Sequence, residues 1–217
     1  MKLVRATLFA ALALGTPAAI LAQAPSDLAS ASKLSPDEQN DSWTYRNPDV
    51  ALSKYQRFII QPTVVYADPA AQWGSTTPAQ RQKYAAYMTT ALRNAIAAGY
   101  QIADRPGAGV ATMRLTLLGV KNTVGGIATA SRMTPMGFAL NGIQSLRGKK
   151  GSMTGSAHVA LEVTDSRNGD LLFAAVRQKS PNALDIESTL STEKTVEAVA
   201  NDVADSVRKG LDRANGR

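Results

Sequence analysis

Apolar side chains recur at helical spacing between Thr77 and Gly99. Thr77 is a good N-cap, Pro78 suits the first helical position, and Gln80 completes a capping box. Gly99 is expected to end the helix as a left-handed C-cap. The apolar stripe of this segment consists of Tyr84, Met88, Ala91, Leu92, Ala95 and Ile96. This pattern predicts an amphipathic helix that buries one face.

A second segment with helical spacing runs from about Thr189 to Ala214. Its buried stripe is predicted to consist of Val196, Val199, Val203, Val207 and Leu211. Charged residues occupy the opposite face. Asp202 and Asp205 lie there among basic residues, which indicates a solvated face rather than a catalytic pair of carboxylates.

Strand patterns occupy much of the remaining chain. The predicted strands span residues 55–66, 100–103, 113–121, 152–164 and 171–179. Pro62 interrupts the first of them, because proline cannot donate to a strand ladder. Asn168-Gly169 marks a hairpin turn before the last strand. This order of elements predicts an α+β domain with a mixed or mainly antiparallel sheet covered by two amphipathic helices, and with a long insertion between strands.

The first 22 residues have the features of a secretory signal peptide. Lys2 and Arg5 precede an uncharged, mostly apolar run over residues 6–14, and small residues follow. Cleavage is expected after Ala22, because cleavage after Ala24 would leave a proline directly behind the cut. The apolar run is far shorter than the ~20 residues that span a bilayer, which disfavours an uncleaved anchor.

The next segment, residues 23–47, is rich in Ser, Ala, Asp, Pro and Asn and has no apolar periodicity. It is predicted to be a flexible tether, with Trp43 and Tyr45 as contacts to the domain surface. Residues 48–217 are then expected to form a single α+β domain. No transmembrane span is expected after signal cleavage.

The composition excludes several classes of protein. The 217 residues contain no Cys, which excludes a disulfide framework, a Cys-ligated zinc site, an iron–sulfur cluster and a Cys nucleophile. The net charge of +7 falls to +5 when Lys2 and Arg5 leave with the signal peptide. Outside the cytoplasm this basic balance favours lipid headgroups, cell-wall polymers or acidic proteins over nucleic acid as partners. Solubility alone is the simpler explanation.

No catalytic, cofactor-binding or metal-binding residues are predicted. His158 is the single His, and no cluster of potential ligands stands near it in the sequence, so an exposed structural histidine is the better interpretation. Gly107-Ala108-Gly109 matches the start of a dinucleotide fingerprint, but strand residues follow where a helix should begin. A plain turn is therefore expected there.

Residues 122–151 are unusual, because a connection of about 30 residues between strands is much longer than the usual ~4–6. Thr134-Pro135 is typical of a helix start, and apolar residues at helical spacing then precede basic ones. One interpretation is a mobile amphipathic element that contacts a partner or a membrane surface. The alternative is a short helix that covers the sheet edge. The residues of this candidate interaction surface are Met136, Leu140, Ile143, Arg147, Lys149 and Lys150.

Two runs resemble a known family. They are YRNPDVALSKYQRFIIQPTVVY over residues 45–66 and GSAHVALEVTDS over residues 155–166, the latter followed by NGDLL over residues 168–172. Both are similar to a bacterial family of predicted envelope lipoproteins known as domain of unknown function 3313, with Asn168 where the family usually has Thr. The resemblance covers roughly residues 45–213. It implies a cell-envelope location and supplies no catalytic residues.

The chain departs from that family at the anchor. Such lipoproteins carry a lipid-bearing Cys just after the signal segment, whereas Gln23 stands there and the chain has no Cys. We therefore expect no lipid anchor and a soluble protein that is periplasmic or otherwise exported.

The expected function is a non-enzymatic periplasmic interaction or assembly module, with an envelope protein or an anionic membrane surface as its partner. One alternative is a carboxylate-dependent periplasmic hydrolase, which would need two carboxylates about 5–9.5 Å apart in a pocket. The other is a small-ligand binder, which would need a mostly apolar cavity of ~300–1,000 Å³.

Overall fold

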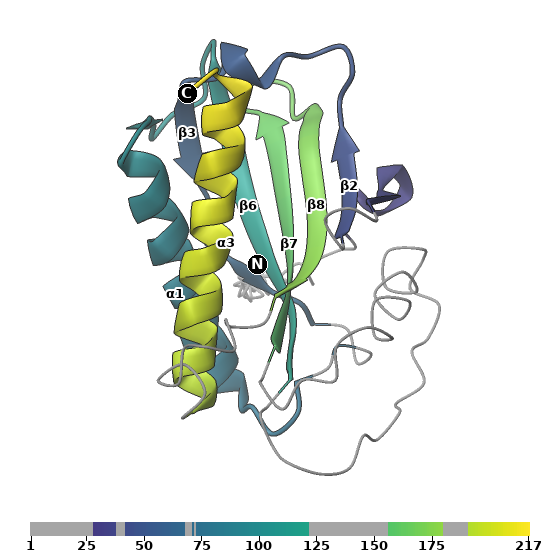
Figure 1. Ribbon diagram of the computed structural model, residues 1–217, viewed down its shortest axis with the longest axis vertical. Helices are drawn as coiled ribbons and strands as arrows, with labels where there is room; N and C mark the ends of the chain where they lie inside the picture. Colours follow the sequence, from purple (N-terminus) through teal and green to yellow (C-terminus); the bar gives the residue numbers. More distant parts are fainter. Residues whose placement is uncertain (1–27, 38–41, 68–70, 72, 122–155, 180–190) are drawn as a thin grey trace, which may run out of the picture.

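The computed structural model describes residues 28–37, 42–67, 71, 73–121, 156–179 and 191–217. Within these residues, two α-helices lie on one face of an open mixed sheet of eight strands (Figure 1). The predicted α+β class, with a mixed sheet covered by two helices, is confirmed. The elements are η1 (Ala31–Lys33), β1 (Ser35–Asp37), β2 (Ser42–Arg46), η2 (Leu52–Lys54), β3 (Arg57–Ile60), β4 (Val64–Val65), α1 (Pro78–Ala97), β5 (Gln101–Ile102), β6 (Val110–Lys121), β7 (Ser156–Asp165), β8 (Leu171–Lys179) and α3 (Thr192–Ala214).

The sheet has an antiparallel half and a parallel half. Its strand order is β1-β2-β8-β7-β6-β3-β5, and β4 also pairs with β6. Strand β3 runs parallel to both β5 and β6, whereas the pairs β1–β2, β2–β8, β8–β7 and β7–β6 are antiparallel. Parallel pairing of β3 with β5 is possible because α1 provides the crossover between them. The expected break at Pro62 separates β3 from β4.

Helix α1 begins as the sequence predicts. The Gln80 N–H donates to Thr77 Oγ1 at 3.3 Å, and the Thr77 N–H donates to Gln80 Oε1 at 2.8 Å, so the capping box is complete. The buried residues of the helix are Tyr84, Ala85, Met88, Leu92 and Ile96. The predicted left-handed C-cap is wrong, because Ala98 is the C-cap in a right-handed conformation and Gly99 is not among the glycines with positive φ.

We expect Thr77→Ala to lower the free energy of unfolding by about 1 kcal/mol, because the N–H of Gln80 loses its acceptor. Chemical unfolding followed by circular dichroism measures the loss. The control is Thr90→Ala, at an exposed position on the same helix, which should change stability much less. Equal effects of the two substitutions would contradict a capping role for Thr77.

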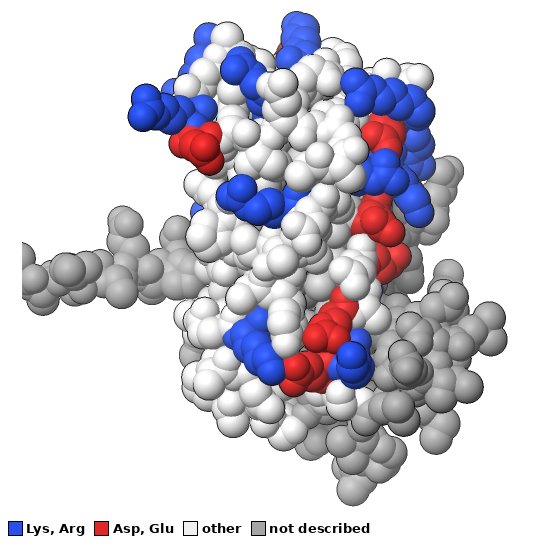
Figure 2. All heavy atoms as spheres, turned by 90° about the vertical axis from the view of Figure 1, so that its left-hand side faces the viewer, with Lys and Arg blue, Asp and Glu red and all other residues white. Residues whose placement is uncertain are grey.

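Helix α3 buries its predicted stripe and packs beside α1. Ser191 caps its start by accepting from the N–H of Lys194 at 3.2 Å. Val196, Val199 and Leu211 are buried, whereas Val207 is only partly buried. Lys83 of α1 forms an ion pair with Glu193 at 2.7 Å, which joins the two helices. Acidic and basic side chains follow one another along the exposed side of α3 (Figure 2).

The prediction of a flexible tether over residues 23–47 does not hold for its described part. Residues 42–46 form β2, which pairs with β8 over its whole length, and residues 35–37 form β1 beside it. Leu28 and Leu34 belong to the buried core. The folded unit therefore begins by residue 28, not at residue 48. The partner of β2 lies more than 120 residues away along the chain, so no local pattern reveals the pairing.

The long insertion connects two strands that are direct neighbours. Lys121, the last residue of β6, pairs with Ser156, the first residue of β7. The candidate surface of Met136, Leu140, Ile143, Arg147, Lys149 and Lys150 lies outside the described residues. Residues 122–155 are thus bounded by two strand ends that already lie side by side.

Candidate functional site

Two helices are too narrow to cover this sheet. Helices pack about 8–10 Å apart and strands about 4.8 Å apart, so two helices cover about four strands. In the described part of the chain, α1 contacts β3, β4, β5 and β6, and α3 contacts β7. Figure 1 shows α1 and α3 side by side over one half of the sheet, with β8 and β2 beyond α3. Among the described residues, no helix therefore covers the helix-side face of β8 and β2.

A groove of about 700 Å³ lies over this uncovered face. Its floor is apolar and is formed by Val159, Leu161, Val163, Phe173 and Ala175 of β7 and β8. One wall is α3, whose Val203, Val207 and Leu211 face the groove. The position of Val207 explains why this member of the α3 stripe is only partly buried.

The rim of the groove is basic. Six Lys and Arg residues but only two carboxylates line it, the carboxylates being Asp37 and Asp212. Asp212 is already held by an ion pair with Arg208 and by the hydroxyl of Tyr100, which donates to it at 3.0 Å. The basic residues are Arg46, Arg177, Lys179, Lys209, Arg213 and Arg217. An anionic occupant would therefore be attracted from several sides.

Two buried polar atoms at or beside one end of the groove lack partners among the described residues. Ser42 and Arg177 are directly paired residues of β2 and β8, so their side chains share the groove face. Within the described residues, Ser42 Oγ and Arg177 Nε are buried without a hydrogen-bond partner. Beside them, Lys179 bridges to Asp202 of α3 at 2.7 Å. A buried donor without an acceptor costs about 1–3 kcal/mol, so an acceptor that reached Arg177 Nε would be favoured.

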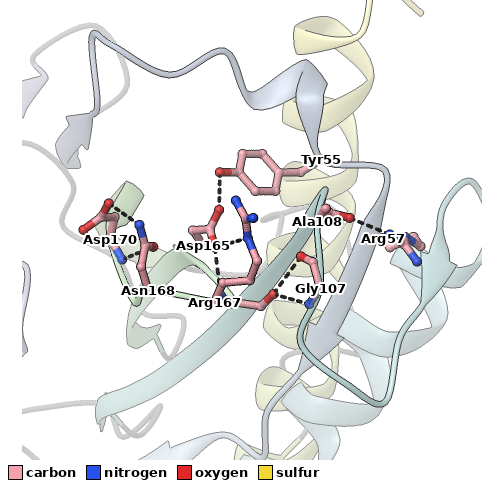
Figure 3. A network of polar contacts seen from close by, with 9 residues as sticks. Tyr55, Arg57, Gly107, Ala108, Asp165, Arg167, Asn168 and Asp170 are labelled. Atoms are coloured by element: carbon pink, nitrogen blue, oxygen red, sulfur yellow. Dashed lines mark hydrogen bonds and ion pairs between the residues drawn. The ribbon is translucent and has the colours of Figure 1, made fainter.

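The other end of the groove is fixed by a network of polar contacts (Figure 3). The hydroxyl of Tyr55 donates to Asp165 Oδ2 at 2.9 Å, and the N–H of Arg167 donates to Asp165 Oδ1 at 2.8 Å. Tyr55 directly follows η2, and Leu52 of η2 lines the groove. Asp165 therefore ties η2 to the β7–β8 hairpin and holds Leu52 in place.

The network shifts the pKa values of both partners. Hydrogen bonds, above all from the backbone of Arg167 and then from Tyr55, lower the pKa of Asp165 from its ordinary value of 3.8. Burial, followed by the hydrogen bond to Asp165, raises the pKa of Tyr55 to about 12. Both shifts favour the ionised carboxylate and the neutral phenol, which is the pair that the hydrogen bond requires.

Asp165 should therefore make stability sensitive to acid. Its pKa is lower in the folded than in the unfolded chain, so its contribution is present above pH 3.8 and is lost as the pH falls through the folded pKa. We expect Asp165→Asn to be less stable than wild type at pH 7 but to show a shallower decline between pH 5 and pH 2. Urea unfolding across this range measures both slopes, and identical slopes would contradict the assignment.

The opposite face of the sheet is closed by the N-terminal segment. Glu162 alternates with Leu161 and Val163 along β7, so it points away from the groove. It is 4% exposed, accepts from the N–H of Ser30 at 2.9 Å and forms an ion pair with Arg114. Leu28 and Leu34 are buried in the same segment. This face is therefore occupied, in contrast to the groove face.

Comparison with known proteins places the chain in a family. The model described as "Protein of unknown function (DUF3313)" matches residues 24–207. The chain belongs to this family. No curated protein matches the sequence.

Solved structures resemble this DUF3313 chain at low identity. A PelC dodecamer from Paraburkholderia phytofirmans is 14% identical with a TM-score of 0.34, covering 78% of this chain and 95% of the other. A predicted lipoprotein from Caulobacter crescentus CB15 is 11% identical with a TM-score of 0.33, covering 75% and 90%. A DUF4136 family protein from Bacteroides thetaiotaomicron is 11% identical with a TM-score of 0.32, covering 76% and 96%.

The residues that the sequence singled out for chemistry lie apart in this DUF3313 chain. His158 is partly buried in β7, two strand positions from Ala160 on the face away from the groove. Gly109 has a φ of 67° and belongs to the turn before β6, as expected. Asp202 and Asp205 are exposed on α3. In the described ranges, no three His, Asp or Glu side chains gather as a metal site, and neither helix has the length and apolarity of a membrane span.

Sequence reasoning missed the groove. Its residues come from β1, β2, η2, β6, β7, β8, α3 and the C-terminus, and each looks like an ordinary core or surface position by itself. One signal was available, because two predicted helices cannot cover a sheet of this width. That signal becomes decisive only once the described N-terminal residues are known to add β2 and β1 to the sheet.

Proposed function

We propose that this chain is a non-enzymatic interaction module of the cell envelope that is exported to the periplasm and binds a partner in the groove beside α3. The observation that carries the proposal is the groove itself, with its apolar floor and basic rim. Apolar area supplies the binding energy of a docking surface, and complementary charge supplies specificity and speed of association. The signal peptide predicted over residues 1–22 supports the location.

The hydrolase alternative receives less support from the groove. A glycosidase-like site needs two carboxylates that face each other across the substrate. Of the two carboxylates in the lining, Asp212 is engaged by Arg208 and Tyr100. The remaining charged residues of the lining, apart from Asp37, are basic. Such a lining favours binding an anion over acid–base chemistry.

The small-ligand alternative is favoured by one observation. The groove volume of about 700 Å³ lies within the range of ~300–1,000 Å³ that is typical of ligand sites. A small ligand and a partner protein would use the same residues, so the experiment must distinguish them directly.

Site-specific photo-crosslinking in cells tests the proposal. With p-benzoylphenylalanine at position 173, on the groove floor, we expect one discrete adduct of higher mass. The same probe at position 90, on the exposed side of α1, is the matched control and should give none. Arg46→Glu, on the groove rim, should weaken the adduct at position 173, whereas Arg93→Glu, exposed on α1, should not. Absence of any adduct at position 173 would overturn the proposal.

The candidate surface predicted from residues 122–151 remains a second proposal. Because Lys121 and Ser156 pair directly, a short hairpin loop can join them without a change of register. Replacement of residues 123–154 by such a loop should leave the melting temperature near that of wild type. If this segment binds the partner, the adduct at position 173 should weaken in the shortened chain. An undiminished adduct would leave the groove as the docking surface.

A further inference from the structure

The groove lies where a third helix could pack on the sheet beside the two helices of the described residues. Helix α3 covers β7, and β8 and β2 are the next two strands of the sheet. At about 4.8 Å per strand, the midpoint between these two strands lies about 7 Å from β7, close to the 8–10 Å between packed helices. We infer that the groove binds an acidic amphipathic helix of a partner protein, which packs beside α3 and completes the helical layer. This inference rests on the proposed function and names the partner of the same site.

The length of the groove fits several helical turns. Along β8, the lining runs from Phe173 to Lys179, which is about 20 Å at 3.4 Å per residue. Along α3, it runs from Val203 to Arg213, which is about 15 Å at 1.5 Å per residue. A helix of about 10–14 residues spans these distances. The amphipathic helix-in-groove mode uses such a length, with apolar anchors at every third or fourth residue.

The wall of α3 allows a second helix to approach closely. Two small residues of α3, Ser206 and Gly210, line the groove together with the larger Val203 and Val207. A Cβ added at Gly210 would meet no atom within 4 Å, so space is open beside this residue. Glycine costs about 1 kcal/mol in a helix interior relative to alanine. A larger residue at position 210 would therefore stabilise α3. The open space beside Gly210 instead provides room for a second helix in the groove.

The charges favour a helix over a single lipid. Lys179 and Arg177 stand at one end of the groove, whereas Arg46 lies opposite Phe173 at the other end, and Lys209 and Arg213 line the α3 side. A single lipid headgroup would need the cationic side chains that bind it to be gathered at one place. Carboxylates spaced along both flanks of a helix can meet cations that are spread over ~20 Å. The basic cluster Arg147, Lys149 and Lys150 of this chain has the wrong sign for the site.

The test is a selection from a peptide library on the mature chain, residues 23–217. The library displays 18-residue helical peptides with apolar residues at the anchor positions and Glu, Gln or Lys at each flanking position. We expect the enriched peptides to carry Glu in clear excess over Lys. Enrichment of neutral or Lys-rich peptides, or no enrichment, would overturn the inference.

Gly210→Gln separates binding from folding. It places a good helix former into open space, so the melting temperature should stay equal or rise, yet it fills the groove. Fluorescence anisotropy should show at least tenfold weaker binding of an enriched peptide. Asn201→Gln, at an exposed α3 position outside the groove, is the matched control and should bind as wild type does. Equal binding by the Gly210→Gln variant would overturn the inference.

Other occupants give different results. Binding to phosphatidylglycerol vesicles that Gly210→Gln abolishes would make the occupant a lipid and overturn the inference. A dimer seen by light scattering and broken by Gly210→Gln would make it a second copy of the chain, with the same consequence. An adduct at position 173 in cells without enrichment of acidic helices would overturn the inference and leave the proposed function standing. Absence of that adduct would overturn the proposed function itself.

Discussion

Leu92→Asp is expected to unfold the domain. Leu92 is 1% exposed and lies between α1 and the sheet, among Met88, Ile96 and other buried side chains. An aspartate there would be a buried charge without a partner, and the site would also lose the packing of the leucine. Together these effects should exceed ~4 kcal/mol, a large part of the stability of a domain of this size.

The measurement is thermal unfolding followed by near- and far-ultraviolet circular dichroism. Thr90→Asp is the control, because Thr90 is exposed on the same helix. The same change at Val203 should cost less than at Leu92, since Val203 is 8% exposed and borders the groove, where an aspartate can reach solvent. A cooperative transition at the wild-type temperature in the Leu92→Asp variant would show that the helix face is assigned wrongly.

Glu162→Ala is expected to have the next largest effect, about 2–3 kcal/mol. The substitution removes the acceptor of the Ser30 N–H and leaves Arg114 without its carboxylate. Breaking a buried ion pair costs about 3–5 kcal/mol, and the partial exposure of Arg114 reduces that cost. Because Ser30 anchors the N-terminal segment, its release should also uncover Leu28 and Leu34.

Urea unfolding measures the loss of stability, and amide hydrogen exchange of residues 28–34 measures the release. Glu197→Ala is the control, because the ion pair of the half-buried Glu197 with the exposed Lys194 joins neighbours of one helix and is worth at most about 1 kcal/mol. Faster exchange of the N-terminal segment with Glu162→Ala alone would support the anchoring role. Unchanged exchange in both variants would contradict it.

The two sides of the sheet therefore differ in what closes them. Glu162 and the N-terminal segment close one side with groups of this chain. Buried polar atoms without partners occur on both sides of the described chain, Ser30 Oγ on the first and Ser42 Oγ and Arg177 Nε on the second. The sides differ because only the second has a groove with an apolar floor and a basic rim. This difference is why the groove, and not the sheet in general, is proposed as the docking surface.

The sequence alone determined the local elements. The capping box of Thr77 and Gln80, the break at Pro62 and the Asn168-Gly169 turn are all formed as predicted. Each depends on residues within a few positions of one another, so a local pattern is sufficient. The apolar stripes of both helices could also be predicted from the sequence, because a helix repeats its buried face every three to four residues. From these elements the α+β class followed.

Only the tertiary structure decided which residues share a surface. Residues 42–46 look like part of a polar tether, yet they form β2 because β8 supplies their hydrogen-bond partners from far along the chain. Arg46, Phe173 and Gly210 become neighbours of one groove only after the sheet has been assembled and α3 has been placed over β7. Such contacts depend on strand order and helix placement, which no pattern of adjacent residues encodes. The sequence thus specified the helices and strands, and their packing created the candidate site.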